Sequence, residues 1–571
     1  MSPRAQRRGR AAGKAVVLVA LLAWSARVAE VEPARLFDRQ SAHAAASFVR
    51  DMFPPDLSSP FLAVVAVAIA RTLAIAVAGS ALAVTLALPL GYLATPTLFR
   101  RGVLFDGEPQ TFGRRALAAL SSAARAVLRF LRAVPDVMWG VLFVVAIGLG
   151  PLAGTLALGV SYAGVLGRVY ADVFEATDPR PLEALHATGA TRLSVFAIGI
   201  WPEARASIIA YTLYSFECCV RAASVLGFIG AGGLGYEINV SMRLFDYRQV
   251  MTLLGAYLLV VFASEALSRA LRGRFARLSR VLLQVPHART GVAALVAVAV
   301  MASFASVGAL DADWHGAWAR ATRFAGSLWP PDTSREFLST LAAPLLQTLA
   351  IGVAGTATGV VVGGGLAIPV VLARVARQGG EHAPLLGAAA AAGRASLAVL
   401  RSIPELLWVL LCIVAIGLGP FAGTLAVGLH TAGVLGKLYA DALEEVSPGA
   451  ADALRSAGAG PVARLVWAVL PEAWPALASY TLLRLEANLR AATIVGLVGG
   501  GGIGLALYND IQLAFYDRVG TLIALVYGLV AVSDLLTDRL RRSTAGLRQT
   551  RVADAPSTAL LASSDGLAAR E

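Results

Sequence analysis

Long apolar stretches recur along the whole chain and are separated by short polar segments. A helix needs about 20 apolar residues to cross a bilayer, so this pattern predicts an all-α polytopic membrane protein with about 12 transmembrane helices. The stretches at 61–95 and 341–373 exceed one span, so part of each is expected outside the bilayer. The short stretches beside Gly150-Pro151 and Gly419-Pro420 form two spans or one broken hairpin in each case. The predicted spans lie near residues 15–31, 61–95, 134–150, 152–172, 207–230, 250–268, 291–309, 341–373, 403–419, 421–441, 476–499 and 519–537.

The second half of the chain repeats the first. Residues 132–172 and 401–441 align without a gap, and 25 of these 41 positions are identical. The same offset of 269 residues continues downstream, whereas the upstream offset is 276 because one loop is shorter in the second half. A repeat of this length indicates two copies of one unit. We expect these units at 1–275 and 276–545, with cores at about 61–272 and 341–540, and a cytoplasmic tail without fixed structure at 546–571.

The composition agrees with a membrane protein. Hydrophobic residues make up 57% of the chain and charged residues only 15%, against about 25% charged in soluble domains. The net charge of +13 would suit nucleic-acid binding, but the basic residues stand in short runs between apolar segments, which favours membrane orientation and no nucleic-acid partner. The three cysteines lie in apolar stretches and the six histidines are scattered, so we expect no metal site, no catalytic residues and no cofactor bound by this chain.

Arginine-rich segments predict the orientation in the membrane. They occur at the N-terminus, around residues 100–115, at the joint 269–289 and after residue 539, whereas segments 237–248 and 311–336 have mixed charge. Positively charged loops stay in the cytoplasm, so both termini are expected there and both halves share one orientation. Parallel repeats of this kind permit a two-fold axis along the membrane normal. No convincing cleavage site follows the apolar run 15–29, so we expect a retained first helix.

A longer, partly polar loop lies between the fourth and fifth predicted spans of each half, at 181–204 and 450–473. In both copies a stretch with helical apolar spacing leads to a glycine, and a second apolar stretch then leads to a proline. This order predicts a short helix, a turn and a second helix. Either loop alone is compatible with an ordinary amphipathic helix at the cytoplasmic surface, but two matched copies favour a shared function.

These loops resemble the coupling loop of ATP-binding-cassette (ABC) importer permeases, in which Glu-Ala-Ala, a glycine and a Leu-Pro pair recur at this spacing. The resemblance implies that each loop docks on an ATP-hydrolysing subunit. Aspartate replaces the motif's glutamate in the second half, which shortens its reach, so the two docking sites are expected to be unequal. The matching residues are Glu183, Ala184, Gly189 and Pro202, and then Asp452, Ala453, Gly458, Leu470 and Pro471; the departures are Leu185, Leu454, Asp452 and Trp201.

The wider chain resembles the phosphonate-type branch of these permeases over nearly all of both halves. The resemblance is carried by Pro-Pro-Asp at 54–56 and 330–332, by Arg-x-x-Pro-Asp/Glu at Arg132 and Arg401, and by the related stretches 211–235 and 480–504. The first half departs at Cys218-Cys219, where the second has Ala487 and Asn488. The resemblance implies two MetI-like bundles in the bacterial cytoplasmic membrane that import a phosphonate or related small oxyanion by alternating access. It also implies two cytoplasmic ABC ATPase subunits and a periplasmic or lipid-anchored substrate-binding protein as partners.

Two Glu–Arg pairs fall inside predicted spans, Glu217 with Arg221 and Glu486 with Arg490. Residues four apart share a helix face, and ionisable side chains at membrane depth face a bundle interior or an aqueous path. One interpretation is an internal pair that fixes helix packing. The other is that the arginines line the path of an anionic substrate, because a guanidinium binds oxyanions in bidentate fashion.

Glycine runs follow these spans and formally match a dinucleotide-binding motif. That motif requires a preceding strand, whereas an apolar membrane helix precedes both runs, so we expect tight turns or close helix approach at the outer mouth. The sequence Gly433–Lys437 is too short for a P-loop, so ATP is expected on a separate partner chain. The glycines are Gly230, Gly232, Gly233, Gly235, Gly499, Gly501, Gly502 and Gly504.

An ion-gradient-driven secondary transporter is the main alternative, since many such proteins also contain parallel repeats. It predicts transport without any ATPase and does not account for the two matched loops. A membrane enzyme is the third possibility, but the sequence offers no catalytic set for it.

Overall fold

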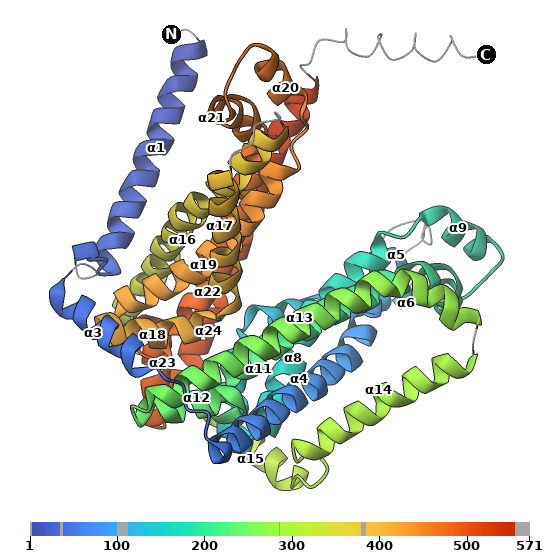
Figure 1. The fold of residues 1–571 in the computed structure, drawn as a ribbon. Helices are drawn as coiled ribbons and strands as arrows, with labels where there is room; N and C mark the ends of the chain where they lie inside the picture. The colour runs from blue at the N-terminus through green and yellow to red at the C-terminus, as the bar shows by residue number, and fades with distance from the viewer. Residues whose placement is uncertain (1–2, 35–37, 100–111, 285, 379–383, 554–571) are drawn as a thin grey trace.

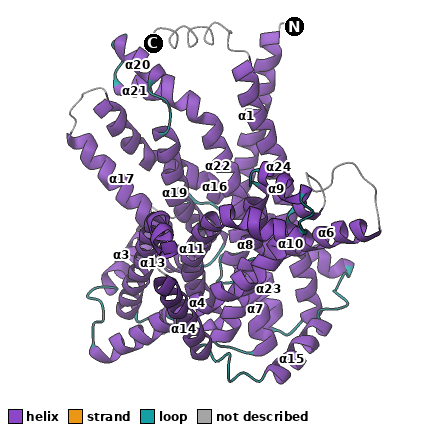
Figure 2. Ribbon diagram, turned by 90° about the vertical axis from the view of Figure 1, so that its right-hand side faces the viewer, coloured by secondary structure: helices purple, strands orange, loops and turns teal. Residues whose placement is uncertain are grey.

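The computed structural model describes residues 3–34, 38–99, 112–284, 286–378 and 384–553, and every regular element in this part of the chain is helical (Figure 2). The first half contains α1 (Pro3–Val28), α3 (Arg39–Asp51), α4 (Ser59–Ala94), α5 (Pro96–Phe99), α6 (Phe112–Ala133), α7 (Asp136–Ile147), α8 (Pro151–Glu175), α9 (Pro179–Ala187), α10 (Arg192–Ser194), the π-helical η2 (Val195–Ile200), α11 (Trp201–Leu226), the π-helical η3 (Gly227–Ala231), α12 (Leu234–Arg243) and α13 (Tyr247–Gln284). The second half contains α14 (Pro286–Ser306), α15 (Trp314–Ser327), α16 (Arg335–Gln378), α17 (Pro384–Ser402), α18 (Glu405–Ile416), α19 (Pro420–Glu444), α20 (Gly449–Ser456), α21 (Pro461–Arg464), the π-helical η4 (Leu465–Val469), α22 (Leu470–Gly496), α23 (Ile503–Gln512) and α24 (Tyr516–Ala553). The all-α prediction is confirmed, while Arg100, Arg101 and residues 554–571 lie outside the described residues.

Seven described helices are long and apolar enough to cross a membrane, and up to nine if each bent pair counts as one span. The bent pairs are α6 with α7, at 89°, and α17 with α18, at 98°. Helices α7 and α18 have 12 residues each, about 18 Å, which is shorter than a hydrocarbon core of about 30 Å. The predicted stretches 134–150 and 403–419 therefore correspond to one arm of a bent pair. The leading stretches 15–31 and 291–309 correspond to the shorter apolar helices Val16–Val28 and Ala294–Ser306.

Small residues allow the central helices of each half to pack closely. Helix α4 packs along α8, and α16 packs along α19 in the same way. A Cβ at Gly79 would lie 2.8 Å from Leu158, and a Cβ at Gly355 would lie 2.8 Å from Val427. Since lipid offers no hydrophobic driving force between helices, close backbone approach of this kind holds a membrane bundle together.

The leading helices of the two halves are exchanged. Helix α1 packs on α16 of the second half, and α14 packs on α4 of the first (Figure 1). The helices that follow are exchanged as well, because α3 contacts α18 and α15 contacts α7. Each half therefore completes its surface with helices from the other.

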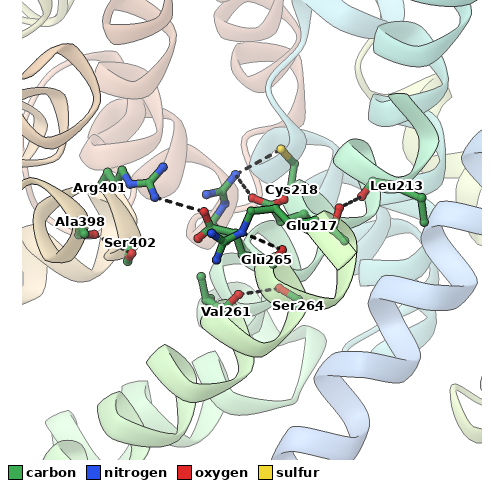
Figure 3. Close-up of polar contacts among 12 residues, drawn as sticks. Leu213, Glu217, Cys218, Val261, Ser264, Glu265, Ala398, Arg401 and Ser402 are labelled. Atoms are coloured by element: carbon green, nitrogen blue, oxygen red, sulfur yellow. Dashed lines mark hydrogen bonds and ion pairs between the residues drawn. The ribbon is translucent and has the colours of Figure 1, made fainter. Parts of the chain in front are cut away.

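Two ion pairs join the halves across the interface. Arg132 Nη2 lies 2.8 Å from Asp534 Oδ2 on α24, and Arg401 Nη2 lies 3.1 Å from Glu265 Oε1 on α13. Figure 3 shows Arg401 reaching the helix that carries Glu265. The repeat offset relates the two pairs to each other, so the interface is two-fold symmetric at this point.

Hydrogen bonds from the Pro-Pro-Asp segments stabilise the N-termini of α4 and α16. Asp56 accepts the backbone N–H of Ser58 at 3.0 Å, and Asp332 accepts that of Ser334 at 2.9 Å; these bonds lower the pKa of both carboxyls. The Asp56 carbonyl accepts the hydroxyl of Thr252 in α13 at 2.7 Å. The motif therefore ties the first long helix of a half to its last.

Candidate functional site

The two halves converge near α12 and α23 and diverge toward α9 and α20 (Figure 1). Helices α9 and α20 belong to the loops 181–204 and 450–473 that the sequence matched to coupling loops. The diverging ends therefore carry these loops, and the converging ends carry the glycine-rich turns.

The first loop presents its motif residues to solvent. Asp178 caps α9 by accepting the N–H of Arg180 at 3.1 Å, and the helix ends before Gly189, whose φ is +81°. This left-handed conformation requires glycine, although a Cβ there would meet no atom within 4 Å. Glu183 and Ala184 are exposed, while Leu182 and Leu185 pack against Gly199 of η2. Leucine at the position of the motif's second alanine thus serves packing within the loop.

The second loop has the same geometry. Gly458 has φ +82°, and its N–H donates to the carbonyl of Arg455 at 2.8 Å, which ends α20. Asp452 and Ala453 are exposed, as are Pro471 and its counterpart Pro202. Each loop is therefore a short exposed helix, a glycine turn and a second helix, which suits contact with another protein.

The glycine-rich turns are also matched. Gly230, Gly232 and Gly233 have φ of +101°, +81° and +74°, and Gly499, Gly501 and Gly502 have +99°, +79° and +76°. The final glycine of each run allows close backbone packing. A Cβ at Gly235 would lie 1.7 Å from the carbonyl oxygen of Ser224, and a Cβ at Gly504 would lie 2.0 Å from the carbonyl oxygen of Thr493. Both expected features, tight turns and close approach, occur here.

Three of these glycines line a cavity of roughly 890 Å³ at the converging end, namely Gly230, Gly499 and Gly501. Valine, leucine and isoleucine side chains of α7 and α18 contribute to its apolar lining, and Asn239 and Arg243 of α12 with Asn509 and Gln512 of α23 contribute to its polar lining. This cavity is the candidate outer vestibule.

A second cavity, of roughly 500 Å³, lies between the halves on the side of the exposed loops. Its charged lining comes from α7, α11, α17, α18, α19 and α22. Apolar residues follow one another from this cavity to the outer one: Val225 of α11 and Ile494 of α22 line the inner cavity, and Ile229 of η3 and Val498, just after α22, line the outer one. They form an apolar barrier between the two cavities. The acidic and basic residues that line the inner cavity are Asp136, Glu217, Arg221, Arg401, Glu405, His430, Lys437 and Arg484.

The two predicted Glu–Arg pairs differ in their surroundings. Arg221 lines the inner cavity, where its Nη2 lies 3.8 Å from Glu217 and donates to Cys218 Sγ at 3.3 Å. Arg490 is not among the residues that line this cavity; its Nη2 lies 3.3 Å from Glu486 and 3.8 Å from Asp534 on α24. Arg221 therefore faces the inner cavity, whereas Arg490 lies among carboxylates of α22 and α24.

The sequence reading missed a charged cluster in the second half. Glu405 on α18 lies 3.0 Å from Arg484 Nη2 and 3.3 Å from His430 Nε2. Arg484 Nε also donates to the Thr431 hydroxyl at 3.3 Å, and His430 Nδ1 is held by the Ile403 carbonyl at 2.8 Å. The equivalents of His430 and Arg484 in the first half are Ser161 and Ser215, so a comparison of unlike positions in the repeat would have found the cluster.

Metal binding has no evident centre in the part of the chain that the structure describes. Among the described residues, no group of three or more His, Cys, Asp or Glu side chains is arranged to hold a metal ion. The chemistry of the inner cavity is therefore that of arginine, lysine and histidine facing carboxylates.

Comparison with known proteins gives a consistent result. The family model described as "Binding-protein-dependent transport system inner membrane component" matches residues 111–281 and 385–546. The phosphate-import permease protein PhnE of Mycolicibacterium smegmatis is 33% identical over 87% of this chain and 88% of its own length. The phosphite transport system permease protein PtxC of Stutzerimonas stutzeri is 37% identical over 44% of this chain and 88% of its own length. Among solved structures, the inward-facing MetNI methionine ABC transporter matches with 24% identity and a TM-score of 0.33, covering 37% of this chain and 99% of that chain.

Proposed function

The chain belongs to the family of binding-protein-dependent transport system inner membrane components, and from this premise we propose that it forms the channel of an ABC importer for a phosphonate or a related small oxyanion. It is a multi-pass membrane transport subunit and not an enzyme. A phosphate-import permease and a phosphite transport permease among its relatives support an oxyanion of phosphorus as the substrate.

The observation that carries the proposal is the pair of matched exposed loops. Glu183, Ala184, Gly189 and Pro202, with Asp452, Ala453, Gly458 and Pro471, dock on two ATPase subunits, one per loop. ATP is hydrolysed on those subunits. Their approach draws the diverging ends together and shifts the channel between its two states, as differential binding requires.

A substrate-binding protein, periplasmic or lipid-anchored, delivers the oxyanion to the outer vestibule beside Gly230, Gly499 and Gly501. Both termini and both coupling loops then face the cytoplasm. Because one chain supplies two halves, the units 1–275 and 276–545 together form one pore.

Uptake of a phosphonate by proteoliposomes that contain this chain, its ATPase and its binding protein tests the proposal. We expect ATP-dependent uptake that falls at least tenfold in Gly189→Val and Gly458→Val, since valine does not tolerate positive φ. Gly255→Ala and Gly528→Ala are matched controls, because both glycines lie inside helices with open space around them. Uptake without any ATPase would overturn the proposal in favour of the secondary transporter.

A further inference from the structure

We propose that the inner cavity contains a single oxyanion site, formed by Arg221 of the first half with Arg484 and His430 of the second. The site takes a tetrahedral oxyanion of phosphorus that carries one proton. The choice of phosphorus rests on the function proposed above, whereas the site itself rests on the cavity and its charges.

Two of the four cationic side chains in the cavity are committed to carboxylates outside its lining. Arg401 pairs with Glu265 at 3.1 Å, and Lys437 pairs with Asp441 at 2.6 Å. Arg221 and Arg484 are the other two. Among the described residues, no partner lies within hydrogen-bonding distance of Nε or Nη1 of Arg221, or of Nη1 of Arg484. Both guanidinium groups therefore retain donors for an anion.

Glu405 positions two of the three groups that form the site. Its carboxylate accepts from Arg484 Nη2 and lies 3.3 Å from His430 Nε2, so Arg484 and His430 are already positioned and largely shielded from bulk water. An arriving oxyanion takes the place of this carboxylate and does not have to order free side chains. Because the oxyanion must displace the Glu405 carboxylate, its affinity for the site stays moderate. Transport requires moderate affinity, since the substrate must also leave the site.

His430 supplies the preference for a protonated oxyanion. Its Nδ1 is fixed at the Ile403 carbonyl, so Nε2 is the ring atom that faces the cavity group Glu405. When Nε2 carries no proton, it accepts a hydrogen bond from a P–OH group. When Nε2 is protonated, it donates a hydrogen bond to a P–O⁻ oxygen. Sulfate, which has no such hydrogen at neutral pH, makes only the second contact.

The chain has one such site because the repeat has diverged at these positions. Ser161 and Ser215 replace His430 and Arg484 in the first half and bring no charge. Arg490, the counterpart of Arg221, is engaged by Glu486 and Asp534 away from the cavity lining.

Cys218 is a native reporter of occupancy. It lines the cavity with its Sγ 3.3 Å from Arg221 Nη2, whereas Cys219 and Cys412 are buried. The rate of Cys218 modification by the anionic reagent methanethiosulfonate ethylsulfonate is measured on the full chain in nanodiscs at constant ionic strength. Cys218→Ala identifies the labelled residue.

We expect phosphite, phosphate or 2-aminoethylphosphonate to slow modification at least fivefold and saturably, sulfate to slow it less, and chloride not to slow it. The protection ratio is the modification rate without the oxyanion divided by the rate with it, measured within each variant. We expect this ratio to fall below twofold in Arg221→Gln and Arg484→Gln and to persist in Arg490→Gln. Because Arg484→Gln leaves Glu405 without this partner, Arg484→Gln with Glu405→Gln is the second variant and loses protection as well.

Protection that survives both arginine changes, or that never occurs, overturns the site, and equal protection by sulfate overturns the role of His430. The assay needs no ATPase, so it separates the two proposals. ATP-driven uptake without protection overturns the site alone, while protection without ATP-driven uptake overturns the transport function alone.

Discussion

The two halves have the same helices but surround the inner cavity with different chemistry. In the second half, hydrogen bonds run without a break from Thr356 on α16 to Asn488 (2.8 Å), to Thr431 (2.9 Å), to Arg484 (3.3 Å) and to Glu405 (3.0 Å). The first half has Ser80, Cys219, Tyr162, Ser215 and Asp136 at these positions. There the hydroxyls of Ser80 and Ser215 are buried without a hydrogen-bond partner among the described residues.

This difference separates two kinds of constraint on a duplicated membrane protein. Positions that decide backbone shape are kept in both halves, as the equal φ angles of Gly189 and Gly458 illustrate. Among the positions that line the inner cavity, His430, Arg484 and Cys218 have diverged from their counterparts Ser161, Ser215 and Ala487, whereas Glu217 and Arg221 have identical counterparts. The predictions below test this division, beginning with the positions where the halves should behave alike.

The largest effect is expected where backbones touch. Gly235→Ala and Gly504→Ala should each abolish folding, because the added Cβ would lie 1.7 Å from the Ser224 carbonyl and 2.0 Å from that of Thr493. Gly255→Ala is the control, because Gly255 lies inside α13 with ordinary helical φ and a Cβ there would meet no atom within 4 Å. The yield of monodisperse protein measures the effect. Tolerance of alanine in either half would refute the view that the backbones are equally constrained.

Equivalent substitutions in the polar network should cost different amounts of stability in the two halves. Asn488→Ala removes the partner of the Thr431 and Thr356 hydroxyls and should cost about 2–3 kcal/mol, whereas Cys219→Ala at the equivalent position should cost about 1 kcal/mol. Thermal unfolding of the detergent-solubilised variants compares the two. Equal loss of stability would mean that the network contributes no more than the packing it replaced.

The interface ion pairs should differ by a smaller amount. Arg401→Gln leaves Glu265 without a cation among the described residues and should lower the free energy of unfolding by about 1–2 kcal/mol. Arg132→Gln leaves Asp534 with Arg490 at 3.8 Å and should lower it by less than about 1 kcal/mol. Adding Glu265→Gln to Arg401→Gln should recover most of the loss in a double-mutant cycle. No recovery would show that Arg401 acts through packing.

The smallest effect is expected at the coupling loops. If aspartate reaches its docking partner less well than glutamate, Asp452→Glu should raise ATP-dependent uptake and Glu183→Asp should lower it, each about two- to threefold, or ~0.5 kcal/mol. Asp452→Asn, which removes the charge and keeps the size, is the control. Uptake that responds in the same direction to both exchanges would contradict unequal docking.

The sequence predicted much of the fold because the relevant signals are local. Apolar length gave the helices, the gap-free repeat gave two matched units, and Gly189 and Gly458 marked turns that only glycine adopts readily. The 12-residue arms α7 and α18 were expected only as short spans or parts of a hairpin, since periodicity does not report a bend of 89° or 98°.

The exchange of leading helices and the charged cluster were not predicted, for different reasons. The apolar parts of α1 and α14, Val16–Val28 and Ala294–Ser306, contain few polar residues, so nothing in their sequence identifies the half on which they pack. His430 and Arg484 did leave a signal, since each interrupts an apolar span at a position where the first half has serine. The signal lies in the difference between the two copies and not in their identity.

The exchanged leading helices impose an order on biosynthesis. The surface of α4 that α14 covers is completed only after the ribosome has passed residue 306, and α1 must wait for α16, which ends at Gln378. During that interval the surface of α4 that α14 later covers is exposed in the nascent first half. The first half of a neighbouring nascent chain exposes the same surface. Tethering the correct helices to the same polypeptide raises their effective concentration, so each chain completes itself before it can trade helices with another.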